Sequence, residues 1–134
     1  MTEKAKTDRR RHVLVVDDNK ELAQTYQQLL EAFGHRATTA GDGEAALQFI
    51  RENEVDAILC DISMPRLEGD QFYEAAERAR PGIGRRFIFL TGHVNHPRFG
   101  PFLKSGKVRV LYKPVPIANL LEALKALMAE TAGK

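Results

Sequence analysis

The sequence predicts an α/β fold, a doubly wound parallel sheet of five strands with helices on both faces. Short apolar runs alternate five times with stretches whose apolar residues recur every three or four positions. The run at residues 57–60 is continuously apolar, which is typical of a strand buried on both faces. No internal repeat or change of composition divides the 134 residues, so we expect one main domain.

The first half of the chain predicts three strands and two helices. Strands are expected at residues 12–16, 35–40 and 57–60, with a second helix at 44–53. Asp18 or Asn19 can cap the first helix, and Gly34 ends it. The apolar stripe that this helix should bury consists of Leu22, Tyr26, Leu29, Leu30 and Phe33.

The second half predicts two further strands and three helices. A helix is expected at residues 69–80, and strands at 86–90 and 108–112. Pro97, Gly100 and Pro101 leave room in residues 94–106 only for a short or distorted helix. The last helix should begin near Pro116, and its apolar stripe is Ile117, Leu120, Leu121, Leu124, Leu127 and Met128.

Alternating strands and helices require a parallel sheet joined by right-handed crossovers. Of the Rossmann-like and flavodoxin-like strand orders, five strands favour the flavodoxin-like order 2-1-3-4-5, whose switch point lies between strands 1 and 3. Asp17 and Asp18 follow the first strand, and Asp61 follows the third. We therefore expect these three carboxylates to meet in the crevice at the carboxyl edge of the sheet.

Composition excludes several classes of protein. The chain is 43% apolar and 28% charged, and no apolar run approaches the roughly 18 residues of a membrane span. The charged N-terminus lacks the apolar core of a signal peptide, so we expect no membrane insertion and a cytoplasmic location. The single Cys60 lies inside an apolar run and is expected to be a buried hydrophobe.

The net charge of +2 is unevenly distributed. We expect residues 1–11 to be a basic, disordered leader or linker, residues 12–130 to be the main domain, and residues 131–134 to be a C-terminal tail. The basic segment could touch nucleic acid or an acidic membrane. Zinc-finger spacing, a helix-turn-helix unit and interleaved aromatic residues are all missing beside it, which disfavours a nucleic-acid partner.

Three adjacent carboxylates repel one another by about 1 kcal/mol per pair in water, and by more in a cleft. An all-oxygen site of this kind suits Mg²⁺ better than Zn²⁺. Thr91 after the fourth strand brings a hydroxyl, and Lys113 after the fifth brings an ammonium. These are the parts that phosphoryl transfer needs, with Asp61 as the nucleophile and an aspartyl phosphate as the product.

The ordered set of motifs resembles the receiver domain of two-component response regulators, of the chemotaxis-regulator kind. The motifs are DD at 17–18, D-x-x-x-P at 61–65, T-G at 91–92 and K-P at 113–114, and the resemblance covers residues 11 to about 130. It implies that Asp61 is the phosphoacceptor, that Asp17 and Asp18 hold Mg²⁺, and that Asp18 is the more direct ligand. The Ser63 backbone carbonyl would be a further ligand, and Thr91 and Lys113 would serve the switch and the phosphate.

The resemblance also implies partners. The phosphoryl donor would be a sensor histidine kinase or a histidine phosphotransfer protein, and the modified surface around strands 4 and 5 would bind a downstream protein. The protein would then be a signalling switch and not a turnover enzyme, although it would catalyse part of its own phosphorylation and dephosphorylation.

One departure from the family pattern concerns the readout of the modification. The family usually has Tyr or Phe three residues before the lysine, where this chain has Val110. Tyr112 shares the strand face of Val110 and is a candidate substitute. Ser63 and His93 occupy the positions that tune water access.

His93 and His96 are spaced like a metal pair, but no Cys or further His joins them, which favours surface histidines.

Two other functions stay open at this point. A receiver-like module that binds partners without phosphate is consistent with the missing aromatic residue. An aspartate-nucleophile phosphatase of the haloacid dehalogenase kind would carry D-x-D after the first strand, whereas this chain has adjacent aspartates there.

Overall fold

The computed structural model describes residues 10–92 and 99–131. Its five parallel strands lie in the order β2-β1-β3-β4-β5, which confirms the predicted doubly wound fold. The strands are β1 (His12–Val16), β2 (Arg36–Ala40), β3 (Ala57–Asp61), β4 (Phe87–Thr91) and β5 (Arg109–Tyr112). The helices are α2 (Lys20–Ala32), α3 (Gly43–Glu52), α4 (Gly69–Ala79), α5 (Gly100–Leu103) and α6 (Ile117–Thr131).

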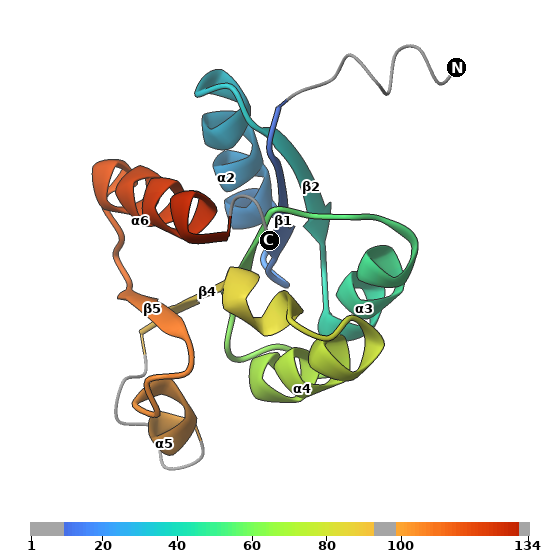
Figure 1. Ribbon diagram of the computed structural model, residues 1–134. Coiled ribbons are helices and arrows are strands. Elements are labelled where there is room, and N and C mark those ends of the chain that lie inside the picture. The colour runs from blue at the N-terminus through green and yellow to red at the C-terminus, as the bar shows by residue number, and fades with distance from the viewer. Residues whose placement is uncertain (1–9, 93–98, 132–134) are drawn as a thin grey trace.

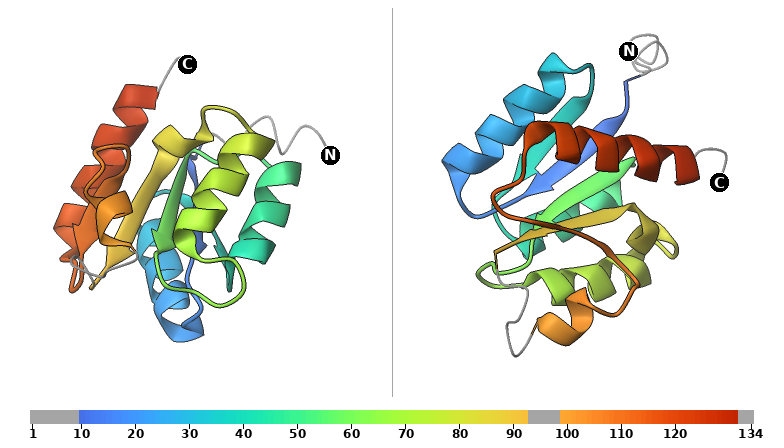
Figure 2. Two further views of the ribbon diagram at one scale, coloured as in Figure 1. Left: turned by 90° about the horizontal axis from the view of Figure 1, so that it is seen from below. Right: turned by 90° about the vertical axis from the view of Figure 1, so that its left-hand side faces the viewer.

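Two apolar clusters cover the two faces of the sheet. Helices α2 and α6 pack on one face, where Leu30 and Leu124 are fully buried. Helices α3, α4 and α5 pack on the other, where Ile50 and Phe72 are fully buried. The sheet lies between α6 and the pair of α3 and α4 (Figures 1 and 2). The buried Cys60 belongs to the second face, as expected.

The helix bounds follow local capping chemistry. Asn19 is the N-cap of α2, and its side chain accepts a hydrogen bond from the Leu22 amide, which decides between the two predicted caps. Asp42 caps α3 in the same way through the Ala45 amide. Gly34 follows α2 with a φ of 93°, a left-handed conformation that favours glycine.

The structure corrects three local expectations. Phe33 was placed on the buried stripe of the first helix, but it is the C-cap of α2 and is 57% exposed. A short 3₁₀ helix (η1, Ile83–Arg86), which the sequence did not predict, precedes β4. Asp61 is the last residue of β3 and does not lie beyond it, because it still pairs with Leu90 of β4.

Strand register positions the carboxyl edge of the sheet. Val16 of β1 pairs with Cys60 of β3, so the residues that follow them, Asp17 and Asp61, emerge side by side. Thr91 of β4 pairs with Tyr112 of β5. Within residues 10–92 and 99–131, no helix is long and apolar enough to cross a membrane.

Candidate functional site

The three predicted carboxylates meet at the carboxyl edge of the sheet. One carboxylate oxygen from each of Asp17, Asp18 and Asp61 lies within 4.8 Å of the other two. Asp17 is buried, Asp61 is partly buried, and Asp18 is exposed. The cluster therefore opens to solvent on one side, as a site that receives a ligand requires.

Burial raises the pKa of both inner carboxyl groups. Desolvation is the largest influence on Asp61, where nearby Lys113 lowers the pKa and Asp17 raises it. The pKa of Asp17 is also raised, first by burial, although the Asn19 amide and Lys113 oppose the shift. The fold thus holds these carboxylates at an energetic cost that a cation can offset.

Lys113 places a positive charge beside the acidic cluster. Its ammonium nitrogen lies 3.8 Å from a carboxylate oxygen of Asp61 and 4.0 Å from one of Asp17. The Lys113 amide donates to the Thr91 carbonyl at 2.9 Å, which fixes the start of the following loop on the end of β4. Thr91 itself is 1% exposed.

Backbone amides orient the inner carboxylates. The Asn19 amide donates to Asp17 at 2.9 Å, and the Ser63 amide lies 3.4 Å from an Asp61 carboxylate oxygen. Ser63 therefore lies in the loop against Asp61, where its carbonyl was predicted to contribute. The structure brings together Asp17, Asp18, Asp61, Ser63 and Lys113, with Thr91 at the end of the adjacent strand.

Sequence reasoning missed how the loop after Asp61 is held. Arg66, which has a positive φ of 66°, forms an ion pair with Asp42, the cap of α3. A Cβ on Gly43 would lie 2.2 Å from the Leu67 carbonyl oxygen, so the loop packs on the first turn of α3 only because that residue is glycine. The Gly41-Asp42-Gly43 turn was visible in the sequence, but its contact with a distant loop was not.

The position that usually carries an aromatic residue differs here. Val110 is partly buried and packs against the cluster beneath α4 and α5. Tyr112, the candidate substitute, is 49% exposed. His93, which with Ser63 was predicted to tune water access, lies outside the described residues, and so does His96.

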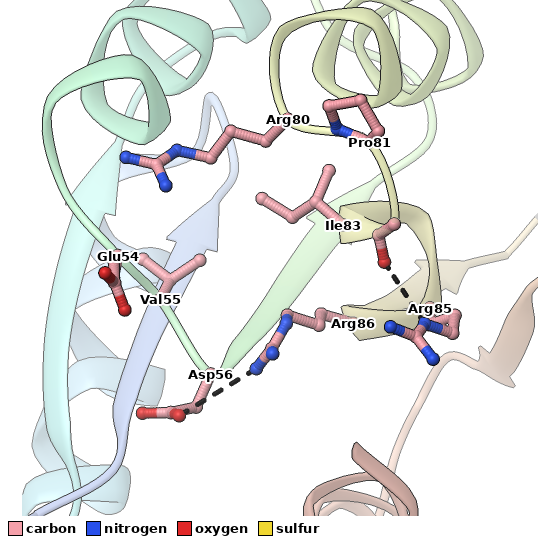
Figure 3. Close-up of a pocket in the computed structure, with 9 residues that line it drawn as sticks. Glu54, Val55, Asp56, Arg80, Pro81, Ile83, Arg85 and Arg86 are labelled. Atoms are coloured by element: carbon pink, nitrogen blue, oxygen red, sulfur yellow. Dashed lines mark hydrogen bonds and ion pairs between the residues drawn. The ribbon is translucent and has the colours of Figure 1, made fainter. Parts of the chain in front are cut away.

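A polar cleft at the opposite edge of the sheet is a separate feature. It encloses about 320 Å³ and is lined by residues that include Asp56, Arg80, Arg85 and Arg86. Arg86 lies 3.9 Å from Asp56, and Arg85 donates to the Gly82 carbonyl (Figure 3). The cleft lies before β3 and β4, whereas the acidic cluster follows β1 and β3, so the two do not form one site.

The donor set of the acidic cluster fits a hard divalent cation. Three carboxylates converge, the described part of the cluster contains no thiolate or imidazole, and burial raises the pKa of two carboxyl groups. Oxygen ligands of this kind are those that Mg²⁺ prefers.

Comparison with known proteins places this chain in a family. Residues 13–125 match the family described as the response regulator receiver domain. A response regulator receiver protein of Anaeromyxobacter sp. (strain Fw109-5) is 32% identical over 84% of this chain and 46% of its own length. The virulence sensor protein BvgS of Bordetella pertussis is 34% identical over 90% of this chain and 10% of its own length. The transcriptional regulatory protein ZraR of Escherichia coli K12 is 29% identical over 89% of this chain and 26% of its own length.

Solved structures agree with the sequence relatives. The receiver domain of the Francisella response regulator 1452 is 32% identical, with a TM-score of 0.76 over 90% of this chain and 98% of that one. The chemotaxis protein CheY4 of Vibrio cholerae is 28% identical, with a TM-score of 0.78 over 88% of this chain and 98% of that one. This chain spans less than half the length of the curated relatives named above but nearly all of these solved domains. We conclude that it belongs to the response regulator receiver domain family of two-component signalling.

Proposed function

We propose that this chain is a phosphorylation switch in which Asp61 accepts a phosphoryl group from a phosphohistidine. The observation that carries the proposal is the convergence of Asp17, Asp18 and Asp61 with the Lys113 ammonium, 3.8 Å from Asp61. The motifs that resemble a receiver domain and the family match support the same assignment.

The transfer requires one bond to form and one to break. A carboxylate oxygen of Asp61 forms a bond to phosphorus, the phosphorus–nitrogen bond of the phosphohistidine breaks, and the electron pair stays on the imidazole nitrogen. Lys113 pairs with the phosphoryl oxygens as negative charge spreads over them. Because Lys113 already faces both Asp61 and Asp17, its ammonium needs little reorganisation to do so.

Asp17, Asp18 and Asp61 would hold Mg²⁺, with the Ser63 carbonyl as a further ligand. When bound, Mg²⁺ supplies positive charge that offsets the carboxylates and the incoming phosphoryl oxygens. The Asn19 and Ser63 amides contact the carboxylates of Asp17 and Asp61 and limit their motion.

Thr91 would convert the modification into a conformational signal. Its hydroxyl can donate to a phosphoryl oxygen that is absent before the reaction, which draws the end of β4 toward Asp61.

The partners would be a sensor histidine kinase or histidine phosphotransfer protein as donor, and a downstream protein that binds near β4 and β5. The relationship to a virulence sensor protein supports a sensor-kinase partner.

Intact mass spectrometry tests the reaction. After incubation with Mg²⁺ and acetyl phosphate, we expect a single phosphoryl adduct that is absent in Asp61→Asn and absent when EDTA is present. An adduct of equal yield in Asp61→Asn would remove the proposal. A phosphohistidine peptide serves as the second donor, and failure with both donors would also reject the proposal.

A phosphate-independent interaction module is the second candidate. The observation that favours it is the side-chain pattern of β5, where Val110 replaces the usual aromatic residue and Tyr112 is 49% exposed. Under this alternative the adduct forms, but amide NMR shifts around β4 and β5 stay unchanged and partner affinity does not depend on phosphorylation.

A further inference from the structure

A mostly apolar pocket lies between α2 and α6, at the edge of the sheet opposite the acidic cluster. It encloses about 450 Å³, which is within the range of ligand-binding pockets. The residues that line it are Arg11, Phe33, His35, Leu121, Lys125, Met128 and Ala129. Arg11 precedes β1 and Phe33 ends α2, whereas the acidic cluster follows the last residue of β1. The pocket is therefore separate from the proposed phosphorylation site.

Two side chains in this pocket are unusual for a surface that meets only water. Phe33 is one of two large apolar side chains that are exposed in the described part of the chain, and the other, Tyr112, lies at the opposite edge. The Nδ1 atom of His35 is buried and has no hydrogen-bond partner among the described residues. A buried nitrogen without a partner costs free energy.

The charge on the rim of the pocket has one sign. Arg11 and Lys125 are both cationic, and no lining residue is acidic. Arg11 lies 3.7 Å from Asp56, which offsets part of its charge, whereas Lys125 forms no ion pair within residues 10–92 and 99–131. An occupant that matches this surface combines an apolar side chain with a neighbouring carboxylate.

We propose that the pocket docks an acidic amphipathic segment of a partner protein. An apolar side chain of the partner packs against Phe33, Leu121 and Met128, and a carboxylate pairs with Lys125. The partner would then engage the chain at an edge that phosphorylation does not occupy, so the interaction is independent of the switch at Asp61.

Charge disfavours two other occupants. A second copy that buried the same pocket would bring Lys125 and Arg11 of two molecules together. The chain's own residues 1–9 hold Lys4, Lys6 and Arg9 against Glu3 and Asp8, so this segment carries the same sign as the rim. A partner with the opposite charge fits better than either.

Fluorescence anisotropy with two peptides tests the proposal. The first is an amphipathic helical peptide with leucine on one face and glutamate on the other, and the second replaces every glutamate by lysine. We expect the acidic peptide to bind and the basic one to bind far more weakly. Phe33→Ala should weaken binding at least about tenfold, as loss of an aromatic anchor does. Lys125→Glu should weaken it several-fold.

A matched variant separates the pocket from the rest of the surface. Lys107→Glu reverses an exposed charge away from the pocket and should bind like the unmodified chain. Circular dichroism checks that each variant is folded. Amide NMR shifts of the unmodified chain locate binding without any substitution, and we expect them at Leu121 and Met128. Absence of binding, equal binding of both peptides, unchanged binding of Phe33→Ala or shifts confined to other residues would overturn the proposal.

Discussion

The ammonium of Lys113 lies 3.8 Å from a carboxylate oxygen of Asp61. Asp61 ends β3 and Lys113 follows β5, and β4 lies between these two strands. The contact reaches across one strand because the ends of β3 and β5 converge on the same edge of the sheet. Lys113 also lies 4.0 Å from Asp17, so a single cation faces both inner carboxylates.

Removing this cation should impair phosphoryl transfer. Lys113→Ala is expected to slow formation of the phosphoryl adduct at least about tenfold, because the variant loses a fixed positive charge beside the reacting oxygens. The pKa of Asp61 should rise further, since Lys113 lowers it. Adduct formation is followed by mass spectrometry, and the pKa by carbon NMR titration of the carboxyl group. The exposed Lys107→Ala is the control, and equal rates in the two variants would contradict the assignment.

Neutralising Asp61 should stabilise the fold. Burial raises the pKa of Asp61 above its ordinary value of 3.8, so the folded state binds the proton more tightly than the unfolded chain does. The charged carboxylate therefore costs stability at neutral pH, and that cost disappears as the pH falls through the folded pKa. Asp61→Asn should therefore raise the free energy of unfolding at neutral pH.

Urea unfolding at neutral and acidic pH measures this effect. The gain from Asp61→Asn should shrink as the pH falls and nearly vanish below the ordinary carboxyl pKa. The exposed Glu74→Gln is the control and should change little at either pH. A variant that is less stable than the unmodified chain at neutral pH would show that Asp61 does not carry this cost.

Mg²⁺ should stabilise the chain through the acidic cluster. At a hundredfold excess over its Kd, a ligand that binds only the folded state contributes about 2.7 kcal/mol. The melting temperature should therefore rise with Mg²⁺ but not with the same ionic strength of NaCl. Asp17→Asn should lose most of the rise in melting temperature. An undiminished rise in this variant would show that Mg²⁺ binds somewhere other than the acidic cluster.

Gly43 should be required to hold the loop after Asp61. A Cβ at this position would lie 2.2 Å from the Leu67 carbonyl, so Gly43→Ala should cost about 1–3 kcal/mol and slow adduct formation. Gly41→Ala is a close control in the same turn, because a Cβ there meets no atom within 4 Å. Thermal unfolding and adduct mass compare the two, and equal effects would contradict the loop contact.

Thr91 should affect the response and not the modification. Thr91→Ala keeps Asp61 and Lys113, so we expect the phosphoryl adduct to form. The amide shifts of β4 and β5 should then change much less on phosphorylation than in the unmodified chain, because no hydroxyl reaches the phosphoryl oxygen. Unchanged shift differences in Thr91→Ala would assign the switch to another residue.

The sequence predicted the features that depend on periodicity and strand order. The strand at residues 12–16 was predicted with its observed bounds because it is a short apolar run followed by two aspartates. The meeting of Asp17, Asp18 and Asp61 followed from the predicted 2-1-3-4-5 order, since that order makes β1 and β3 neighbours.

Features that depend on contacts between distant loops were not predictable. The ion pair of Arg66 with Asp42 joins two turns, and its partner is chosen by how the loop folds and not by any local pattern. Phe33 fits a helical stripe by spacing, but the helix ends at Ala32, so its side chain leaves the buried face. The 3₁₀ helix at Ile83–Arg86 depends partly on Glu77, which accepts from the amides of Gly82 and Gly84.

The most direct test of the central claim is to locate the phosphoryl group by chemical trapping. Borohydride reduces an aspartyl phosphate to homoserine, and peptide mass spectrometry then identifies the modified position. We predict homoserine at residue 61 after treatment with Mg²⁺ and a phosphodonor, and none when the donor is omitted. Homoserine at Asp17 or Asp18, or a phosphorylated chain that yields none, would contradict the assignment of Asp61 as the phosphoacceptor.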